Sequence, residues 1–277
     1  AQNWVGYMAG NGDFARDNTE TSYDIDFNFG DVLFLVRYGI LFDLNQAKIK
    51  GLATNDTAIA GASMILSAKM YQELVDLFGN VPYSQAFQTD QYPRPAYDKA
   101  EDIYADLQKK LDTAIEYMKK PAPAKFETAD IVNHGDLGKW IRFANTLKLR
   151  LLIRQSEVSS PDRAAVIAKI EANGGVLVEG ETVSVNPGYV NELNKQSPFY
   201  ANYGYTPTDV RATTGTNAND FIITLLSATN DPRLGRFFEP AGSGYFGNVY
   251  GLPAGDLFSG ASTSYFGPGI ISSPTQD

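Results

Sequence analysis

Apolar side chains recur at steps of three and four positions from about residue 31 to residue 173, the period of α-helices that bury one face. The clearest stripe consists of Ile103, Leu107, Leu111, Ile115 and Met118. Polar breaks, glycines and prolines divide this part of the chain into segments of helical length. We therefore expect five helices, at about 31–55, 57–78, 98–120, 136–157 and 160–174.

Local signals mark where these helices begin and end. Gly79 is expected to end the second helix. Asp98, with Glu101 three residues later, has the spacing of a capping box and predicts the start of the third helix. Ser160 followed by Pro161 predicts the cap and first turn of the fifth.

The order of the helices predicts how they pack. The connection between the first two is short, so we expect an antiparallel pair. The second, third and fourth helices start near residues 57, 97 and 137, a rhythm of roughly forty residues. Helix pairs repeating at such a distance stack on their neighbours and share a core. The expected fold class is mainly α.

The helical pattern ends at about Gly175. The stretches 176–178 and 182–185 could form short strands, and residues 218–228 one further helix. From Pro187 onward the chain is rich in Gly, Tyr and Phe, and its aromatic content favours ordered, functional loops over disordered ones. We expect a helical-repeat scaffold at residues 1–185 and an aromatic, Gly-rich loop region at 186–277 that packs on it.

Composition excludes several kinds of chemistry. The 277 residues carry 23 basic and 32 acidic side chains, and the net charge of −9 disfavours a nucleic-acid partner. The absence of cysteine and the single histidine exclude disulfides, thiolate nucleophiles and Cys- or His-rich metal sites. No apolar run approaches the roughly 20 residues of a membrane-spanning helix. We expect no cofactor and no metal ion.

Two motifs match known sites only in part. Residues 242–247 fit GxGxxG, but a dinucleotide site requires a strand before and a helix after it, so a flexible loop is expected. Residues 24–28 repeat the first EF-hand ligand positions, but Phe29 and Leu35 stand where Gly and Glu are required. The sequence leaves open a looser calcium site among Asp13, Asp17, Asp24 and Asp26.

Histidine and the basic residues have simple structural interpretations. His134 lies close to Asp136, but no nucleophile motif accompanies it, so we expect a turn or capping role. The basic side chains of the fourth helix are expected to be solvated or paired with acids of neighbouring helices. They are Lys139, Arg142, Lys148, Arg150 and Arg154.

Tyrosines of the loop region give the strongest binding signal. Flat aromatic faces stack on the C–H faces of sugar rings, and nearby amides bond their hydroxyl groups. The alternative is that most of these rings pack the loops onto the scaffold. The ligand-binding residues that we predict are Tyr200, Asn202, Tyr203, Tyr205, Tyr245 and Tyr250.

A glycan-cleaving enzyme is the alternative from another class. Such an enzyme needs two carboxylates that face each other across a cleft, and sequence spacing does not identify a pair. We predict no catalytic residue. The acids of the loop region, any of which could cap a turn, are Glu192, Asp209, Asp220, Asp231, Glu239 and Asp256.

Four segments carry a family resemblance, at residues 71–86, 97–115, 139–150 and 230–234. The first contains Leu77-Phe78-Gly79-Asn80-Val81-Pro82-Tyr83, and the last reads Asn230-Asp231-Pro232-Arg233-Leu234. In this order they resemble the SusD/RagB-like outer-membrane lipoproteins, which are surface nutrient-binding proteins of Bacteroidetes. The resemblance spans most of the chain.

This resemblance implies a scaffold of tetratricopeptide-like helix pairs with ligand loops, and a non-enzymatic protein. It implies a surface-exposed place in the cell outer membrane, as a lid over a SusC-like TonB-dependent transporter. The ligand would be an oligosaccharide or, in a branch of the family, a peptide. The lipid-bearing cysteine of the family is absent and the chain stops short of the family's last helices, so we expect a fragment whose membrane contact depends on an anchor outside this chain.

Overall fold

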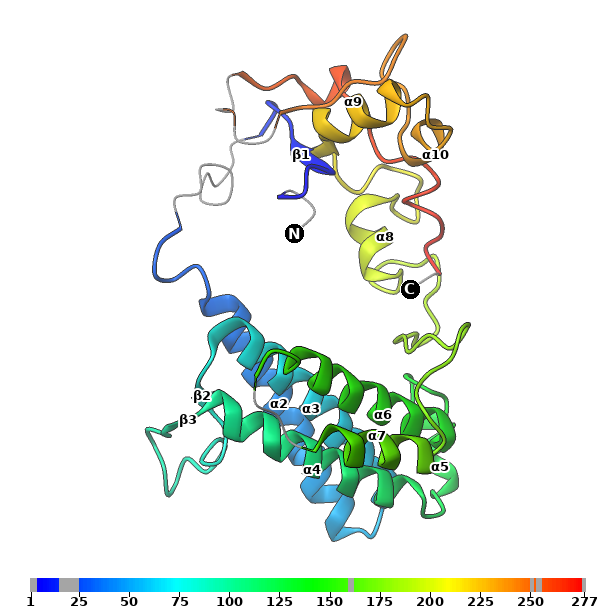
Figure 1. Ribbon diagram of the computed structural model, residues 1–277. Helices are drawn as coiled ribbons and strands as arrows, with labels where there is room; N and C mark the ends of the chain where they lie inside the picture. Colours follow the sequence, from blue (N-terminus) through cyan, green and yellow to red (C-terminus); the bar gives the residue numbers. More distant parts are fainter. Residues whose placement is uncertain (1–3, 15–24, 159–161, 250–251, 253–255, 276–277) are drawn as a thin grey trace. The chain divides into compact units, whose positions relative to one another are not determined.

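The protein is mainly α, as predicted (Figure 1). A computed structural model describes residues 4–14, 25–158, 162–249, 252 and 256–275. Contacts divide the chain into two units. One is the helical unit, Gly30–Val185, and the other, the loop unit, combines Ala1–Phe29 with Asn186–Asp277.

The helical unit contains the five predicted helices and a short additional one. Neighbours pack in sequence: α2 on α3, α3 on α4, α4 on α6, and α6 on α7 (Figure 1). This arrangement confirms the expected stack of helices. The helices are α2 (Asp31–Ala53), α3 (Thr57–Phe78), α4 (Ala100–Met118), the unpredicted α5 (Ala124–Ala129), α6 (Leu137–Arg154) and α7 (Arg163–Ala172).

The helix ends confirm some of the predicted signals and correct others. Gly79 ends α3 with a φ of 72°, a conformation that glycine adopts without strain. The predicted cap at Asp98 is wrong, because its carboxylate accepts hydrogen bonds from the loop at Tyr83 and Ser84 instead. Helix α7 is capped by Asp162, whose side chain accepts from the backbone N–H of Ala165. The cap predicted at residues 160–161 lies outside the described residues.

A continuous apolar core fills the helical unit. The core consists of one face of α4, which includes the fully buried Leu111 and Ile115, together with side chains of other helices such as Leu74 of α3 and Trp140 of α6. Helix α3 is the central element, because it packs against α2, α4 and α6. Burial of large apolar side chains contributes about 1.5–3 kcal/mol each, and this core therefore holds the helices together.

Basic side chains of α6 pair with acids, as one of the two interpretations predicted. Arg142 binds Glu181, and its Nε lies 2.9 Å from Glu181 Oε2. Arg154 Nε lies 3.1 Å from Asp76 Oδ2. Lys148 is buried and donates to Asp112. These pairs tie α6 to neighbouring segments.

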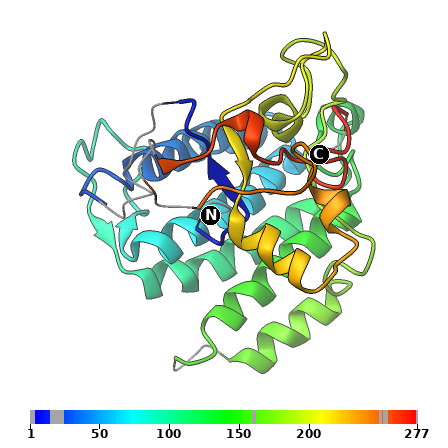
Figure 2. The same cartoon turned by 90° about the horizontal axis from the view of Figure 1, so that it is seen from above.

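The strands of the loop unit join distant parts of the chain. In the loop unit β1 (Met8–Gly10) pairs antiparallel with β4 (Thr216–Ala218), with Ala9 opposite Asn217 (Figure 2). This pairing places the first residues in the loop unit, whereas the sequence analysis assigned residues 1–185 to the scaffold. The stretches 176–178 and 182–185 are not strands, because no other described segment pairs with them.

The other elements in the described part of the loop unit are short helices around a second apolar cluster. Ile222 and Ile223 of α9 meet Phe238, Phe266 and Ile271 in this cluster. The predicted helix at 218–228 is confirmed as α9. The helices are α8 (Pro198–Tyr203), α9 (Asp220–Ala228), α10 (Leu234–Phe237) and the 3₁₀ turn η2 (Gly260–Ser262).

The glycine motif at 242–247 is part of the packing of this unit. Gly242 has a φ of +64° in a tight turn that links Ala241 to Gly244. A Cβ atom on Gly247 would lie 2.4 Å from the backbone of Asn219, so only glycine fits there. The expected loop is therefore closely packed at Gly247, and the described residues next to the motif form neither the strand nor the helix of a dinucleotide site.

Candidate functional site

The predicted tyrosines of α8 border the second apolar cluster. Tyr200, Tyr203 and Tyr245 are half-buried and pack against it, so the structure brings these three rings to one cluster. The ring of Tyr203 lies 5.9 Å from that of Phe266, edge to face. Asn202 is exposed, and its amide donates to the carbonyl of Pro198 at 2.8 Å. These rings contribute to packing, the alternative that the sequence left open.

Tyr205 belongs to a different arrangement. Its hydroxyl accepts from Arg211 at 2.9 Å and donates to Glu239 at 3.2 Å, while Arg211 and Glu239 form an ion pair of 2.6 Å. The Arg211 guanidinium lies 4.9 Å from the ring centre of Tyr205 and 4.2 Å from that of Tyr265. The Tyr205 ring is therefore fixed on one side by a cation. Tyr250, the sixth predicted residue, lies outside the described residues.

Three of the predicted acids of the loop unit, Glu192, Asp231 and Glu239, form ion pairs with basic side chains. Glu239 pairs with Arg211, and Glu192 pairs with Lys195 at 2.6 Å. Hydrogen bonds from Arg233 lower the pKa of Asp231 to about 2. A general acid of a glycosidase needs a raised pKa, which is the opposite of the shift at Asp231.

The smaller sequence motifs have structural roles. His134 is exposed, in a turn with a φ of 52°, and Asp136 caps α6. Asp13 accepts from the backbone N–H of Gly260 at 2.7 Å, and Asp26 accepts from that of Asn28. Among the described residues, no three His, Asp or Glu side chains gather closely enough to hold a metal ion. The other two aspartates of the candidate calcium site, 17 and 24, lie outside this part of the chain.

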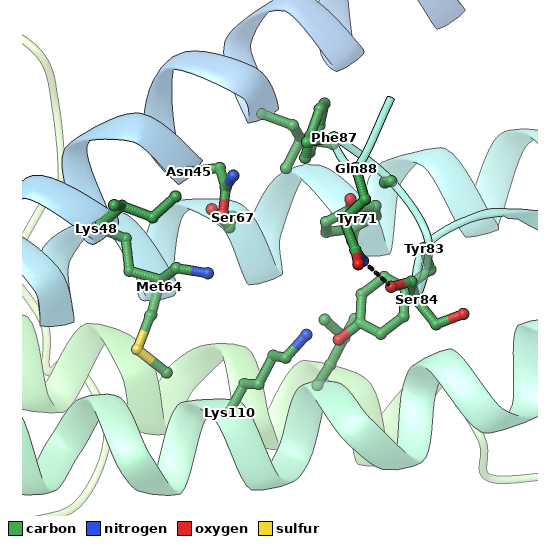
Figure 3. Close-up of a pocket in the computed structure, with 14 residues that line it drawn as sticks. Asn45, Lys48, Met64, Ser67, Tyr71, Tyr83, Ser84, Phe87, Gln88 and Lys110 are labelled. Atoms are coloured by element: carbon green, nitrogen blue, oxygen red, sulfur yellow. Dashed lines mark hydrogen bonds between the residues drawn. The ribbon is translucent and has the colours of Figure 1, made fainter. Parts of the chain in front are cut away.

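The helical unit holds a cavity of about 390 Å³ that the sequence analysis did not predict (Figure 3). Helix α2 contributes Asn45 and Lys48, and α3 contributes Ser67 and Tyr71. Helix α4 and the loop of residues 83–88 complete the wall. A volume of this size is typical of small-molecule sites, and we call it the α2–α4 pocket.

The loop of the α2–α4 pocket is fixed by Asp98. Strands β2 (Val81–Pro82) and β3 (Tyr97–Asp98) pair at its base. The Asp98 carboxylate accepts from the backbone N–H groups of Tyr83 and Ser84, both at 2.9 Å, and from the Ser84 hydroxyl at 2.7 Å. Burial alone would raise the pKa of Asp98, but these hydrogen bonds outweigh it and lower the pKa. The pocket wall is therefore preorganised.

Aromatic rings form one side of the pocket. Tyr71 and Tyr83 meet edge to face with ring centres 4.6 Å apart. Burial, followed by the hydrogen bond to Asp106, raises the pKa of Tyr83, so its hydroxyl stays protonated and donates to that carboxylate at 2.7 Å. Phe87 has a φ of 65°, which is rare for a bulky side chain. Strained backbone of this kind concentrates at binding sites.

A sequence signal for the pocket existed, although it was weak. Asn45 and Lys48 lie three residues apart on α2, on the side of the helix that carries the buried Leu41. Polar residues in such a stripe interrupt an otherwise apolar face. Their meeting with Lys110 of α4 depends on tertiary packing, which periodicity does not predict.

Comparisons with known proteins identify the class of protein. A family model described as starch-binding and associating with the outer membrane matches residues 1–275. The chain therefore belongs to the SusD-like family, and the predicted resemblance is confirmed. In the described part of the chain, the helices lack an apolar stretch that would span a bilayer. No match was found among curated proteins.

Solved structures show the same fold. A chitin-binding SusD homologue from Flavobacterium johnsoniae is 23% identical in sequence, with a TM-score of 0.67. The match covers 96% of this chain and 55% of the homologue's chain. A SusD homologue from Bacteroides fragilis is 18% identical with a TM-score of 0.69, covering 99% and 59%. One from Bacteroides vulgatus is 21% identical with a TM-score of 0.67, covering 99% and 54%. The chain thus spans a little over half the length of these proteins.

Proposed function

We propose that this chain is part of a non-enzymatic protein that binds oligosaccharides at the outer membrane and delivers them to a SusC-like TonB-dependent transporter. The observation that carries the proposal is the match of the starch-binding, SusD-like family model over residues 1–275. The chitin-binding homologue with the same fold supports a glycan ligand. The ion pairs of Glu192, Asp231 and Glu239 with basic side chains support a binding role rather than a catalytic one for these three acids.

The α2–α4 pocket is the place where we propose that a sugar unit binds. It combines aromatic faces with amide and hydroxyl groups, the two kinds of group that recognise the C–H and O–H faces of a sugar ring. Tyr71 and Tyr83 supply the first kind, and Asn45, Ser67 and Ser84 supply the second. Its fixed loop reduces the entropy lost on binding.

The exposed part of α8 stays a second proposed contact surface. Asn202 presents its side chain to solvent, and the neighbouring Phe199 is 39% exposed. An oligosaccharide is longer than one ring, so a protein can contact it at more than one surface. Substitution of Asn202 tests this surface with little cost to folding, because its amide makes only a bond to the preceding turn.

Isothermal titration with maltotetraose, chitotetraose and a tetrapeptide tests the proposed function. We expect binding of at least one saccharide, and a five- to tenfold loss of affinity in Asn45→Ala, equivalent to one hydrogen bond of about 1 kcal/mol. Gln46→Ala, an exposed amide on the same helix, is the matched control and should bind as the unmodified protein does. Binding of the peptide alone would replace the glycan assignment with a peptide one.

Delivery to a transporter requires a second experiment. We expect the protein to elute together with a TonB-dependent transporter when it is purified from outer membranes. Release of sugar from a polysaccharide, abolished by a single carboxylate substitution, would contradict the non-enzymatic assignment.

A further inference from the structure

Two lysine side chains project into the α2–α4 pocket from opposite helices. Lys48 extends from α2 and Lys110 from α4, and both ammonium groups point toward the middle of the pocket (Figure 3). No Asp or Glu is among the described residues that line it. The pocket wall is therefore positively charged, although the whole chain has a net charge of −9.

The two lysines differ in their partners. Lys110 Nζ lies 3.1 Å from Asp106 Oδ2 and 4.1 Å from the ring centre of Tyr83, so its charge is partly balanced. Lys48 takes part in no ion pair among the described residues and is half-buried. Burial, followed by repulsion from Lys110, lowers the pKa of Lys48. Partial burial of a cation without a counter-ion is unfavourable, and an anionic ligand group would reduce that cost.

The rest of the pocket suits a sugar ring beside the charges. Tyr71 and Tyr83 offer aromatic surface, and Asn45 lies one turn before Lys48 on the same helix. The strained backbone at Phe87 lies in the same wall. An ammonium group binds a carboxylate or a sulfate as a point charge, without the bidentate geometry of arginine.

We propose that the α2–α4 pocket binds an anionic sugar unit of an acidic oligosaccharide, with Lys48 and Lys110 holding its carboxylate or sulfate group. The inference rests on the proposed glycan-binding function and adds the charge class of the ligand. In a chain with an excess of acidic residues, this local positive site selects for acidic over neutral glycans by short-range contact rather than by long-range attraction.

The test uses a ligand pair in which the carboxyl groups of the same sugar rings are either free or esterified. Tetragalacturonic acid carries free carboxylates, and its methyl ester presents the same rings without them; a sulfated tetrasaccharide forms the third arm. We expect the acid or the sulfated ligand to bind at least about tenfold more tightly than the ester. The affinity for the charged ligand should fall as the salt concentration rises from about 0.05 M to about 0.5 M.

Variants of Lys48 separate charge from packing. Lys48→Met should lose about tenfold in affinity for the charged ligand and leave the affinity for the ester unchanged, whereas Lys48→Arg should retain most of the binding. Lys50→Met, an exposed lysine near the end of the same helix, is the control with the same change in net charge. Circular dichroism establishes that each variant is folded.

The outcomes distinguish this inference from the function on which it rests. Equal affinity for acid and ester, or an unchanged Lys48→Met, would overturn the inference while leaving glycan binding in place. If no saccharide binds, charged or neutral, both the inference and the proposed glycan-binding function would be overturned. Preference for the carboxylate over the sulfated ligand, or the reverse, would support the inference and identify the anion.

Discussion

The two units of this protein hold their interiors together in different ways. The helical unit buries an apolar core that includes Leu111 and Ile115, both fully shielded from solvent. The loop unit has a smaller apolar cluster and, beside it, asparagines that are almost completely buried. These are Asn11, Asn217, Asn219 and Asn248.

The side chains of these asparagines form hydrogen bonds with loop backbone groups, which have no partners from regular secondary structure. Asn248 accepts from the backbone N–H of Phe258 at 2.7 Å and donates to the carbonyl of the same residue at 3.0 Å. Asn11 donates to Asn217 at 2.7 Å. In helices the backbone groups bond within the element, whereas buried loop backbone must find side-chain partners. The comparison teaches that irregular backbone can be buried when amide side chains complete its hydrogen bonds.

The largest effect is expected in the apolar core of the helical unit. Leu111→Ala removes a fully buried side chain of α4 and should lower the free energy of unfolding of this unit by about 3 kcal/mol, because a cavity remains. Urea denaturation followed by circular dichroism at the helix band measures the loss. Leu77→Ala, at an exposed position of α3, should change stability by less than about 0.5 kcal/mol. Equal losses in the two variants would contradict the assigned core.

An asparagine substitution should produce the next largest effect, in the loop unit. Asn248→Ala leaves the N–H group of Phe258 without its partner and removes one of the two hydrogen bonds to its C=O group, which keeps the bond from the N–H of Gly12, and it should cost about 2 kcal/mol. Hydrogen exchange should show faster exchange of loop-unit amides and unchanged α4 amides. Asn202→Ala, an exposed asparagine, is the control and should have little effect. Loss of protection in both units would show that they do not unfold separately.

A buried carboxylate of the helical unit should make a smaller, pH-dependent contribution. Asp130 accepts from Trp140 Nε1 at 2.7 Å and from the backbone N–H of Gly135 at 3.0 Å. Burial would raise the pKa of Asp130, but these hydrogen bonds outweigh it and lower the pKa. Since the folded-state pKa is below the unfolded value of about 3.9, the stabilisation is complete above that value and is lost as the pH falls through the folded-state pKa.

Unfolding experiments at neutral and acid pH test this contribution. Asp130→Asn should be about 1–2 kcal/mol less stable than the unmodified protein at neutral pH, because a neutral amide forms weaker hydrogen bonds. The difference should shrink as the pH falls below about 4. Asp43→Asn, an exposed carboxylate of α2, is the matched control. A difference that stays constant over this pH range would contradict the assigned role.

Most of the helical unit could be predicted from the sequence, because its information is local. The apolar stripe of α4 lies within that helix, and the glycine that ends α3 follows its last residue directly. The prediction of a cap at Asp98 was wrong because its carboxylate accepts a hydrogen bond from Ser84, which lies fourteen residues away in the sequence. Strands β1 and β4 were missed, because each has three residues and the pairing joins Met8 to Ala218.

The candidate sites depended still more on tertiary structure. Tyrosine content indicated binding surfaces, but it did not show that Tyr200 and Tyr203 would pack against an apolar cluster. The α2–α4 pocket required three helices and a loop to meet. Lys48 and Lys110 are 62 positions apart in the sequence (110 − 48), and no periodicity connects them.

The smallest change in stability is expected for a substitution of Tyr205, which also tests whether this side chain contacts the ligand. Tyr205→Phe removes the hydroxyl from the pair of Arg211 and Glu239 but leaves that ion pair and the ring in place. We expect a loss of about 0.5 kcal/mol in the loop unit, because the ion pair persists. Titration of the same variant with an oligosaccharide completes the test. Weaker binding at nearly unchanged stability would support Tyr205 as a ligand contact, whereas unchanged binding would assign its hydroxyl to the internal network alone.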